Sequence, residues 1–261
     1  MKNKPSPLKS IVKKTAQSFG FTIARYKTEG QKARDIQESI EKIPDADLYC
    51  PTFSPWLSKK FQSYCLPSLP LTLVSPDRLW VLNSLARQVQ SLPGHFVECG
   101  VYKGGTACLF AKTIAEFPAK HKKALHLFDT FKGMPKVNAA KDIHREGDFA
   151  DTDLAAVKAR LAAFSDVFFH PGIVPETFTA IADLKICFAH IDVDIYEAVA
   201  SCCEHLYPKL VPGGIMVFDD YGFASCPGAR SAVDAWFAGK PEVPLVLPTG
   251  QAIVFKLPAS H

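Results

Sequence analysis

The chain has 261 residues, of which 48% are hydrophobic and 21% are charged. This length favours one large domain, or a domain with an appendage, and the apolar content is ample for a packed core. The composition excludes a wholly disordered chain, a collagen-like chain and a small disulfide-held scaffold. No apolar run approaches the about 18–20 uncharged residues of a membrane-spanning helix, and the lysine-rich start lacks a secretory signal. We therefore expect a globular, cytoplasmic protein without a transmembrane segment.

Eight cysteines are scattered along the chain without the paired spacing of a zinc site or a disulfide framework. Several of them, such as Cys99 and Cys187, lie within apolar runs, where cysteine behaves as a small buried hydrophobe. Reduced thiols are typical of the cytoplasm. We predict that these thiols are reduced.

The net charge of +4 is distributed unevenly. Residues 1–34 hold nine lysines and arginines against one acid, so this tail carries +8 and the rest of the chain carries −4. A nucleic-acid binder would be basic over its main surface. Because the body is mildly acidic, we do not expect nucleic acid as a partner.

The first 76 residues differ in pattern from the rest. Between residues 7 and 25, apolar residues recur at helical spacing with lysines between them, which predicts a basic amphipathic helix ending near Gly20. Such a helix suits peripheral contact with an anionic membrane surface or, as we favour, packing against its own domain or a second copy in a homo-oligomer. Residues 43–76 are rich in proline and aromatic residues, which predicts an irregular, packed segment suited to a lid. We divide the chain into an N-terminal extension, residues 1–75, and a main domain, residues 76–261.

The main domain begins with a predicted helix from Pro76 to about Gln90, with proline at an early helical position. From residue 94, short apolar runs alternate with helical patterns. The runs predict strands at His95–Cys99, Ala124–Asp129, Val167–His170, Ile186–Asp192, Gly214–Asp219, Leu245–Leu247 and Ile253–Phe255. The predicted helices between them are Thr106–Glu116, Asp153–Phe164, Tyr196–Leu206 and Gly228–Phe237. This alternation is typical of an α/β fold with a mostly parallel seven-stranded sheet and helices on both faces. The short link between the last two strands predicts an antiparallel hairpin at the edge.

A glycine-rich turn joins the first strand to the following helix. Gly100, Gly104 and Gly105 allow a tight turn and the close approach of a ligand to the backbone at the helix N-terminus. Their spacing, E-x-G-x-x-x-G-G, differs from the G-x-G-x-x-G of dinucleotide sites. Asp129 ends the second strand, where an acid suits the hydroxyl pair of a ribose. The two features predict a nucleoside site.

Four acidic residues follow the fourth and fifth strands. Asp192 and Asp194 are two residues apart, so on an extended strand their side chains share one face. If the fifth strand is a neighbour, Asp219 and Asp220 join them at the carboxyl edge of the sheet, where open α/β sheets bind ligands. Mutual repulsion and oxygen-only chemistry favour a hard divalent cation such as Mg²⁺ over zinc. The alternative for Asp194 is a cap of the next helix.

These motifs resemble those of the macrocin O-methyltransferase family, which are class I S-adenosylmethionine-dependent sugar O-methyltransferases of antibiotic biosynthesis. The matching segments are FVECGVYKGG at 96–105, FDTFKGMP at 128–135, HIDVDIYEA at 190–198 and LYPKLVPGGIMVFDDYG at 206–222. The resemblance implies a Rossmann-like class I methyltransferase fold. It also implies transfer of a methyl group from S-adenosylmethionine to a metal-chelated hydroxyl of a sugar or a glycosylated small molecule.

The resemblance further assigns roles to single residues. The cofactor-binding residues that it implies are Glu98, Gly100, Tyr102, Gly104, Gly105, Thr106, Asp129 and Asp192, with Asp129 on the ribose. The implied ligands of Mg²⁺ or another hard divalent cation are Asp192, Asp219 and Asp220. Some family members use an aspartate at the position of Asp194 as general base and others use a histidine nearby. Because Ile195 follows here, Asp194 is our choice.

Several alternatives stay open. A catechol or another phenolic diol would chelate a metal in the same way as two vicinal sugar hydroxyls. A dehydrogenase, or a non-catalytic nucleotide-binding Rossmann protein, is disfavoured by the lack of G-x-G-x-x-G and by the four acids. His144 is expected to be a solvated loop histidine, with a place at the site mouth as the alternative. His190, within an apolar strand, is expected to be a satisfied core histidine rather than a ligand.

Overall fold

The computed structural model describes residues 54–117 and 119–258. The predicted amphipathic helix between residues 7 and 25 lies outside the described residues. Within them, every helix is too short or too polar to cross a membrane.

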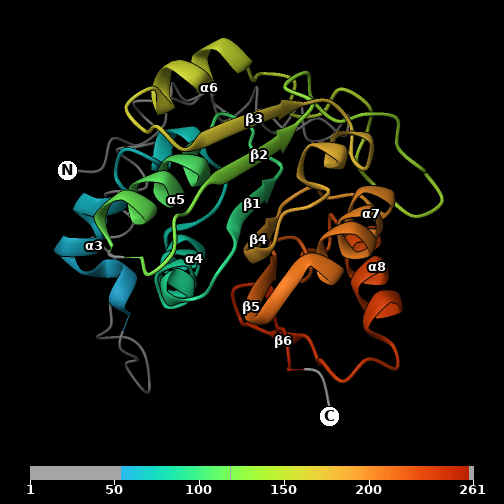
Figure 1. Ribbon diagram of the computed structural model, residues 1–261. Coiled ribbons are helices and arrows are strands. Elements are labelled where there is room, and N and C mark those ends of the chain that lie inside the picture. The colour runs from blue at the N-terminus through green and yellow to red at the C-terminus, as the bar shows by residue number, and fades with distance from the viewer. Residues whose placement is uncertain (1–53, 118, 259–261) are drawn as a thin grey trace, which may run out of the picture. The chain divides into compact units, whose positions relative to one another are not determined.

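One sheet organises the described residues, which contribute seven strands to it in the order β3-β2-β1-β4-β5-β7-β6 (Figure 1). The strands are β1 (His95–Cys99), β2 (Leu125–Asp129), β3 (Val167–Pro171), β4 (Ile186–Ile191), β5 (Leu210–Phe218), β6 (Leu245–Val246) and β7 (Ala252–Phe255). The first five run parallel, while β7 is antiparallel to both of its neighbours, β5 and β6. The predicted parallel sheet with an antiparallel edge hairpin is confirmed.

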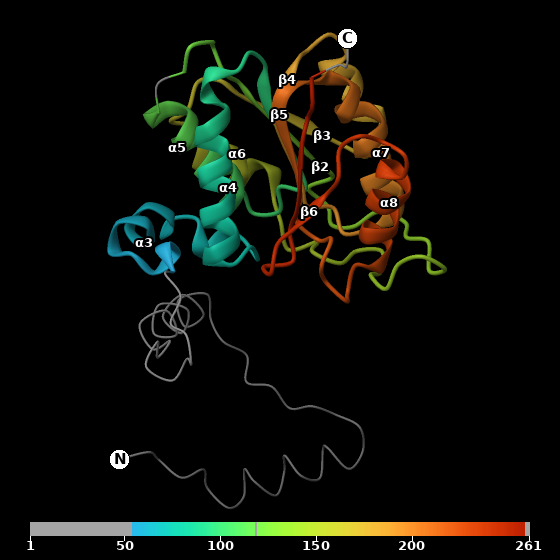
Figure 2. The same ribbon diagram turned by 90° about the horizontal axis from the view of Figure 1, so that it is seen from below.

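Helices cover both faces of this sheet. Figure 2 shows α4 (Pro76–Gln88), α5 (Gly105–Glu116) and α6 (Leu154–Leu161) on one face, with α7 (Tyr196–Leu206) and α8 (Pro227–Phe237) on the other. The remaining helices of the described residues are α3 (Lys59–Cys65) and the 3₁₀ helices η2 (Pro55–Leu57), η3 (Leu69–Leu71), η4 (Val89–Ser91), η5 (Glu176–Ile181) and η6 (Tyr207–Lys209). The three-layer α/β arrangement agrees with the alternation of strands and helices in the sequence.

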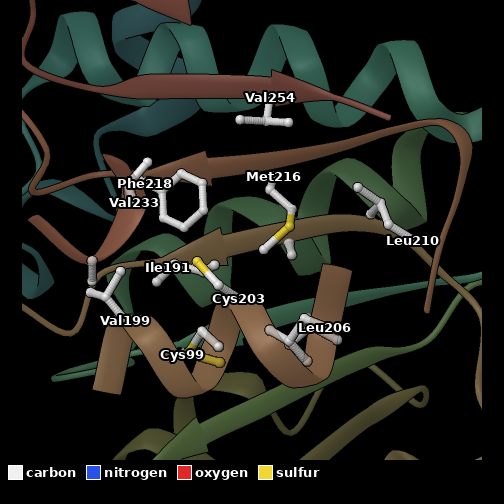
Figure 3. Packing of buried hydrophobic residues seen from close by; sticks show 14 of the residues in the cluster. Cys99, Ile191, Val199, Cys203, Leu206, Leu210, Met216, Phe218, Val233 and Val254 are labelled. Carbon is white, nitrogen blue, oxygen red and sulfur yellow. The ribbon is translucent and has the colours of Figure 1, made fainter. Parts of the chain in front are cut away.

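Helix α7 has the bounds that the sequence predicts, because its apolar residues follow the helical period closely. Its buried residues stand at i, i+3, i+4 and i+7, namely Val199, Cys202, Cys203 and Leu206. They pack on the sheet in one core cluster with Ile191 of β4 and Met216 of β5 (Figure 3). This packing fixes α7 behind the carboxyl edge of β4.

The cysteines agree with their predicted role as small hydrophobes. Seven lie in the described residues, all with free thiols, and six of the seven are buried. Cys50 lies outside the described residues.

Strand β5 is longer than predicted. It begins at Leu210, which pairs with Ile186 of β4, rather than at Gly214. The N–H of Gly213 donates to the carbonyl of Lys256, and the N–H of Lys256 donates to the carbonyl of Gly214, both at 2.8 Å. The sequence Pro-Gly-Gly is typical of a turn, and the register of β5 against β4 shifts there, between Leu210 and Ile215, but the hydrogen bonds to Lys256 hold the segment in the strand.

Residues 54–75, the described part of the predicted extension, pack against α4 and α5. The rings of Phe61 and Trp80 meet edge to face with centroids 4.8 Å apart. The hydroxyls of Tyr64 and Thr113 lie 3.2 Å apart. The expected packing is present, but short helices replace much of the expected irregular chain.

Candidate active site

The site lies where the strand order reverses. β1 stands between β2 and β4, so the connections after β1 and β4 leave in opposite directions and open a crevice at the carboxyl edge. The register aligns Cys99, the last residue of β1, with Phe128 of β2 and with Ile191, the last residue of β4, which in turn pairs with Phe218 at the end of β5. The residues at or just past those ends therefore form one row: Gly100, Asp129, Asp192 and Asp219. The sequence places Asp192 and Asp219 inside strands, but each stands one residue beyond its strand.

A cavity of about 330 Å³ opens above this row. That volume lies within the range of small-molecule and cofactor sites. The predicted site residues that line it are Gly100, Tyr102, Thr106, Asp129, Asp192, Asp194 and Asp220. Glu98, Gly104, Gly105 and Asp219 are not among the lining residues. Residues from the extension and α4 complete the wall, among them Thr72, Val74 and Arg78.

Gly100 lets the backbones of β1 and β4 come together. Its φ is +87°, and a Cβ added to it would stand 1.8 Å from the carbonyl oxygen of Asp192. No other residue type fits such an approach. Gly104 and Gly105 serve protein packing as well, since added Cβ atoms there would meet Val157 at 2.9 Å and the Ser68 carbonyl at 2.7 Å.

Asp129 holds the turn that follows β1. Its Oδ2 accepts the N–H groups of Val101 at 2.7 Å and Tyr102 at 2.9 Å. Its Oδ1 accepts the N–H of Phe131 at 2.7 Å. A carboxylate has about four acceptor positions, so one of them remains on Oδ1 to face the cavity. By that count, Asp129 can accept one further hydrogen bond.

A buried row of charges crosses β1, β4 and β5 beneath the cavity. Nδ1 of His190 lies 3.1 Å from Oε1 of Glu98, and its Nε2 lies 3.6 Å from Oδ1 of Asp219. Burial lowers the pKa of His190, but the two carboxylates outweigh it and raise the pKa to about 10. His190 is in the core as expected, and it serves as the positive charge between two buried acids.

Asp192, Asp219 and Asp220 form a group with the donor chemistry of a hard cation site. One carboxylate oxygen from each lies within 4.8 Å of the others. Burial and the neighbouring carboxylates raise the pKa of Asp192 and of Asp220. Burial opposes ionisation of Asp219, but His190 and Arg78 outweigh it and lower its pKa. A cation would relieve the repulsion that opposes ionisation of Asp192 and Asp220, and carboxylate oxygens are donors that fit Mg²⁺.

Asp194 stands beside this group in an unusual backbone conformation. Its φ of +59° lies in the left-handed region, so the extended backbone expected for residues 192–194 is wrong. The helix-cap interpretation is also wrong, because Ile195 occupies the N-cap of α7 and Asp142 accepts the N–H of Tyr196 at 2.9 Å. The Asp194 carboxylate is thus free of a capping role and lines the cavity.

Two cavity residues were missed or misjudged from the sequence. Arg78 forms an ion pair with Asp219 from 141 residues away along the chain, and no local pattern reports such a contact. His144 lines the cavity with its side chain 16% exposed, so the expectation of a solvated loop histidine is wrong. The polar stretch around His144 was the available signal for a site residue.

Comparisons with known proteins agree with this arrangement. The family model of the macrocin O-methyltransferases matches residues 29–241. The mycinamicin III 3''-O-methyltransferase of Micromonospora griseorubida is 29% identical over 178 residues, 61% of this chain and 68% of that protein. A second relative is the 8-demethyl-8-(2,3-dimethoxy-alpha-L-rhamnosyl)-tetracenomycin-C 4'-O-methyltransferase of Streptomyces olivaceus. It is 29% identical over 176 residues, 62% of this chain and 67% of that protein.

Solved structures show the same fold. The crystal structure of CalS11, a calicheamicin methyltransferase, superimposes with a TM-score of 0.64 and 23% identity, over 89% of this chain and 94% of that chain. The family model spans most of the chain and includes the glycine-rich turn, Asp129 and all four acids at the carboxyl edge. The chain therefore belongs to the macrocin O-methyltransferase family and is an S-adenosylmethionine-dependent O-methyltransferase.

Proposed function

We propose that the protein methylates a hydroxyl group of a sugar or a glycosylated small molecule, held in place by a hard divalent cation on Asp192, Asp219 and Asp220. The observation that carries the proposal is that two groups of residues with different chemistry line the same cavity. The turn after β1, with Asp129, faces the cavity from one side, and the acids after β4 and β5 face it from the other. We infer that a cofactor bound on the first side would lie beside a cation and its acceptor on the second.

The cofactor half is built from β1 and β2. Gly100, Tyr102 and Thr106 present the turn to the methionine part, while Glu98 supports the turn from below. Oε2 of Glu98 is buried and has no hydrogen-bond partner among the described residues, which suits an acceptor facing a bound amino group. The remaining acceptor position of Asp129 Oδ1 suits a ribose hydroxyl. Asp192, on the border of the two halves, would touch both ligands.

The acceptor half is built from β4 and β5. When bound, S-adenosylmethionine supplies an activated methyl group, and a divalent cation supplies the positive charge that acidifies and orients a hydroxyl. The three aspartates hold that charge in place, with His190 and Arg78 balancing Asp219 from behind. Asp194 accepts the hydroxyl proton as the methyl group is transferred. The cavity walls align the reacting groups and exclude water.

The names of the relatives support a glycosylated acceptor. The two curated relatives act on mycinamicin III and on a rhamnosyl tetracenomycin. A catechol or phenolic diol remains the second candidate because two adjacent hydroxyls chelate a cation in either compound. The separate extension at residues 1–75, its peripheral contact with membranes, a homo-oligomeric state and a cytoplasmic location stay predictions from the sequence.

Mass spectrometry of reaction mixtures tests the proposed acceptor. The purified full chain is incubated with S-adenosylmethionine, Mg²⁺ and matched panels of glycosides, nucleotide sugars, catechols and simple phenols. We expect methylated product from at least one sugar-bearing compound, on the sugar, and none when the cofactor is omitted. Methylation confined to the catechol panel would reject the sugar acceptor and leave the enzyme class intact.

A further inference from the structure

Three side chains of different chemistry converge on the wall of the cavity beside the carboxylate group. They are His144 from the loop between β2 and α6, Asp194 before α7 and Cys226 at the N-cap of α8. Nε2 of His144 lies 3.6 Å from Oδ1 of Asp194. Sγ of Cys226 lies 3.5 Å from each of these atoms. One nitrogen, one oxygen and one sulfur thus form a nearly equilateral triangle.

The contact of Nδ1 of His144 with Asp148 determines which protonation state Nε2 presents to the triangle. Nδ1 of His144 lies 3.2 Å from Oδ2 of Asp148. Asp148 Oδ2 also accepts the N–H of Arg145 at 2.9 Å, and this bond together with His144 lowers the pKa of Asp148. An ionised carboxylate only accepts, so Nδ1 carries a proton, and in the neutral imidazole Nε2 then presents its lone pair to Asp194 and Cys226. A carboxylate behind a histidine in this manner is the usual support of a metal-ligating imidazole.

Hydrogen bonds account for only part of this triangle, because the Cys226 thiol has one proton, which it can donate to Oδ1 of Asp194 at 3.5 Å. The 3.6 Å between Nε2 of His144 and Oδ1 of Asp194 exceeds the range of an N–H···O bond, and both atoms are acceptors. A tetrahedral ion with bonds of 2.0–2.3 Å places its nitrogen, oxygen and sulfur ligands about 3.3–3.6 Å apart. The measured edges of 3.5 to 3.6 Å match that arrangement, with the fourth position toward the cavity.

We propose that His144, Asp194 and Cys226 form a second cation site, selective for zinc-class ions over Mg²⁺. Imidazole and thiolate are ligands that zinc and cobalt accept and Mg²⁺ does not. On binding, Asp194 and the neutral His144 each donate a lone pair, and Cys226 donates as thiolate after releasing its proton to solvent. Burial and neighbouring acids raise the pKa of the Cys226 thiol, so the sulfur holds its proton until a cation arrives.

Occupation of this second site has a consequence that rests on the proposed function. Asp194 is the residue that we propose as proton acceptor, and a zinc ion would occupy its carboxylate. Zinc-class ions therefore inhibit methyl transfer even when the Asp192–Asp219–Asp220 group is saturated with Mg²⁺. The binding itself does not depend on what reaction the enzyme performs.

Cobalt(II) titration tests the site without any assay of activity. A cobalt–thiolate bond gives an ultraviolet charge-transfer band, whereas cobalt on carboxylates does not. We expect the band to saturate at one equivalent in the wild-type full chain and to persist in Asp219→Asn, which leaves the three ligands of the second site unchanged. We expect Cys226→Ser to abolish it, with serine still suited to the N-cap of α8. Cys108→Ser, at a partly exposed cysteine on α5, is the matched control and keeps the band.

Substitution of Asp148, which contacts Nδ1 of His144, tests the second site independently of its ligands. Asp148→Asn should weaken cobalt binding by about 10-fold to 100-fold while retaining the band at higher concentration. Thermal unfolding checks that each variant is folded. No band in the wild type, or an undiminished band in folded Cys226→Ser, would overturn the second site. If the band behaves as expected and zinc fails to inhibit an active enzyme, the assignment of Asp194 as proton acceptor is wrong and the second site stands.

Discussion

Asp194 has a carboxylate that the fold does not use for its own stability. Its neighbour Ile195 is the N-cap of α7, and Asp142 from a distant loop satisfies the first free N–H of that helix. The left-handed φ of +59° turns the residue out of the line of β4. Non-glycine residues in this conformation concentrate at functional sites. A single residue is thus held at some cost in a place where its carboxylate meets the cavity.

Replacement of Asp194 by asparagine separates chemistry from structure. Asparagine tolerates the left-handed region, so the fold should remain, but its amide cannot accept the proton. We expect kcat to fall by roughly 10²-fold to 10⁴-fold, with calorimetric affinity for S-adenosylhomocysteine nearly unchanged. The control is Asp183→Asn at an exposed aspartate remote from the cavity lining, which should keep the wild-type rate. A rate near wild type in Asp194→Asn would remove Asp194 from the mechanism.

The turn between β1 and α5 is the element on which the cofactor half rests. Gly100 brings β1 within contact of β4, and the carboxylate of Asp129 ties the next two residues down through their N–H groups. The turn is therefore rigid because of contacts within the protein, before any ligand is present. Substitutions here should damage folding and binding together.

Alanine substitutions at two glycines with positive φ distinguish the cost of a left-handed backbone from the cost of a steric clash at the added Cβ. Gly239 has φ +78° and no atom within 4 Å of an added Cβ, whereas Gly100 has φ +87° and the Asp192 carbonyl at 1.8 Å. We expect Gly239→Ala to cost about 1–2 kcal/mol of unfolding free energy, from the left-handed backbone alone. Gly100→Ala should add at least about 1–3 kcal/mol through overpacking between β1 and β4. Urea unfolding measures both, and equal losses would show that the close approach is unimportant.

At the level of elements, the local sequence pattern predicted the bounds of those strands and helices that local contacts determine. β1 has its predicted bounds because its apolar run ends at a glycine, and α7 because its buried residues keep the helical period. β5 was predicted too short, because hydrogen bonds between Gly213, Gly214 and Lys256, just after β7, override the turn tendency of Pro-Gly-Gly. The hairpin was expected at the edge, but the insertion of β7 beside β5 depends on a long-range pairing that no local pattern reports.

At the level of the whole molecule, the acids were predicted together because parallel strands end at one edge. The pairing of β4 with β5 brings Asp192 near Asp219 and Asp220 as expected. Arg78 and His144 were not assigned to the site, because each reaches it from a segment distant in sequence. Glu98 is fully buried and is not among the residues that line the cavity, so its role at the cofactor stays a prediction. The position of Glu98 along β1 predicted which residues surround it, but not that its side chain is fully buried.

The topology also makes the two halves of the site separable. The proposed cofactor half comes from β1 and β2, and the proposed cation half from β4 and β5, so removal of the cation should leave the cofactor contacts in place. Charge on Asp192 and Asp220 would then lack compensation, and the acceptor would lose its anchor. Turnover is therefore expected to need a divalent cation that cofactor binding does not need.

The rate of methyl transfer by metal-stripped enzyme, titrated with Mg²⁺, tests the central claim most directly. The full chain is stripped with EDTA, with metal removal verified by elemental analysis, and assayed with an acceptor from the sugar panel. We predict that activity is lost on stripping and returns with Mg²⁺, that Asp219→Asn needs more Mg²⁺ or stays inactive, and that S-adenosylhomocysteine binds equally well throughout. Undiminished transfer by the stripped enzyme, or wild-type Mg²⁺ dependence in Asp219→Asn, would contradict a cation on the Asp192–Asp219–Asp220 group as the anchor of the acceptor.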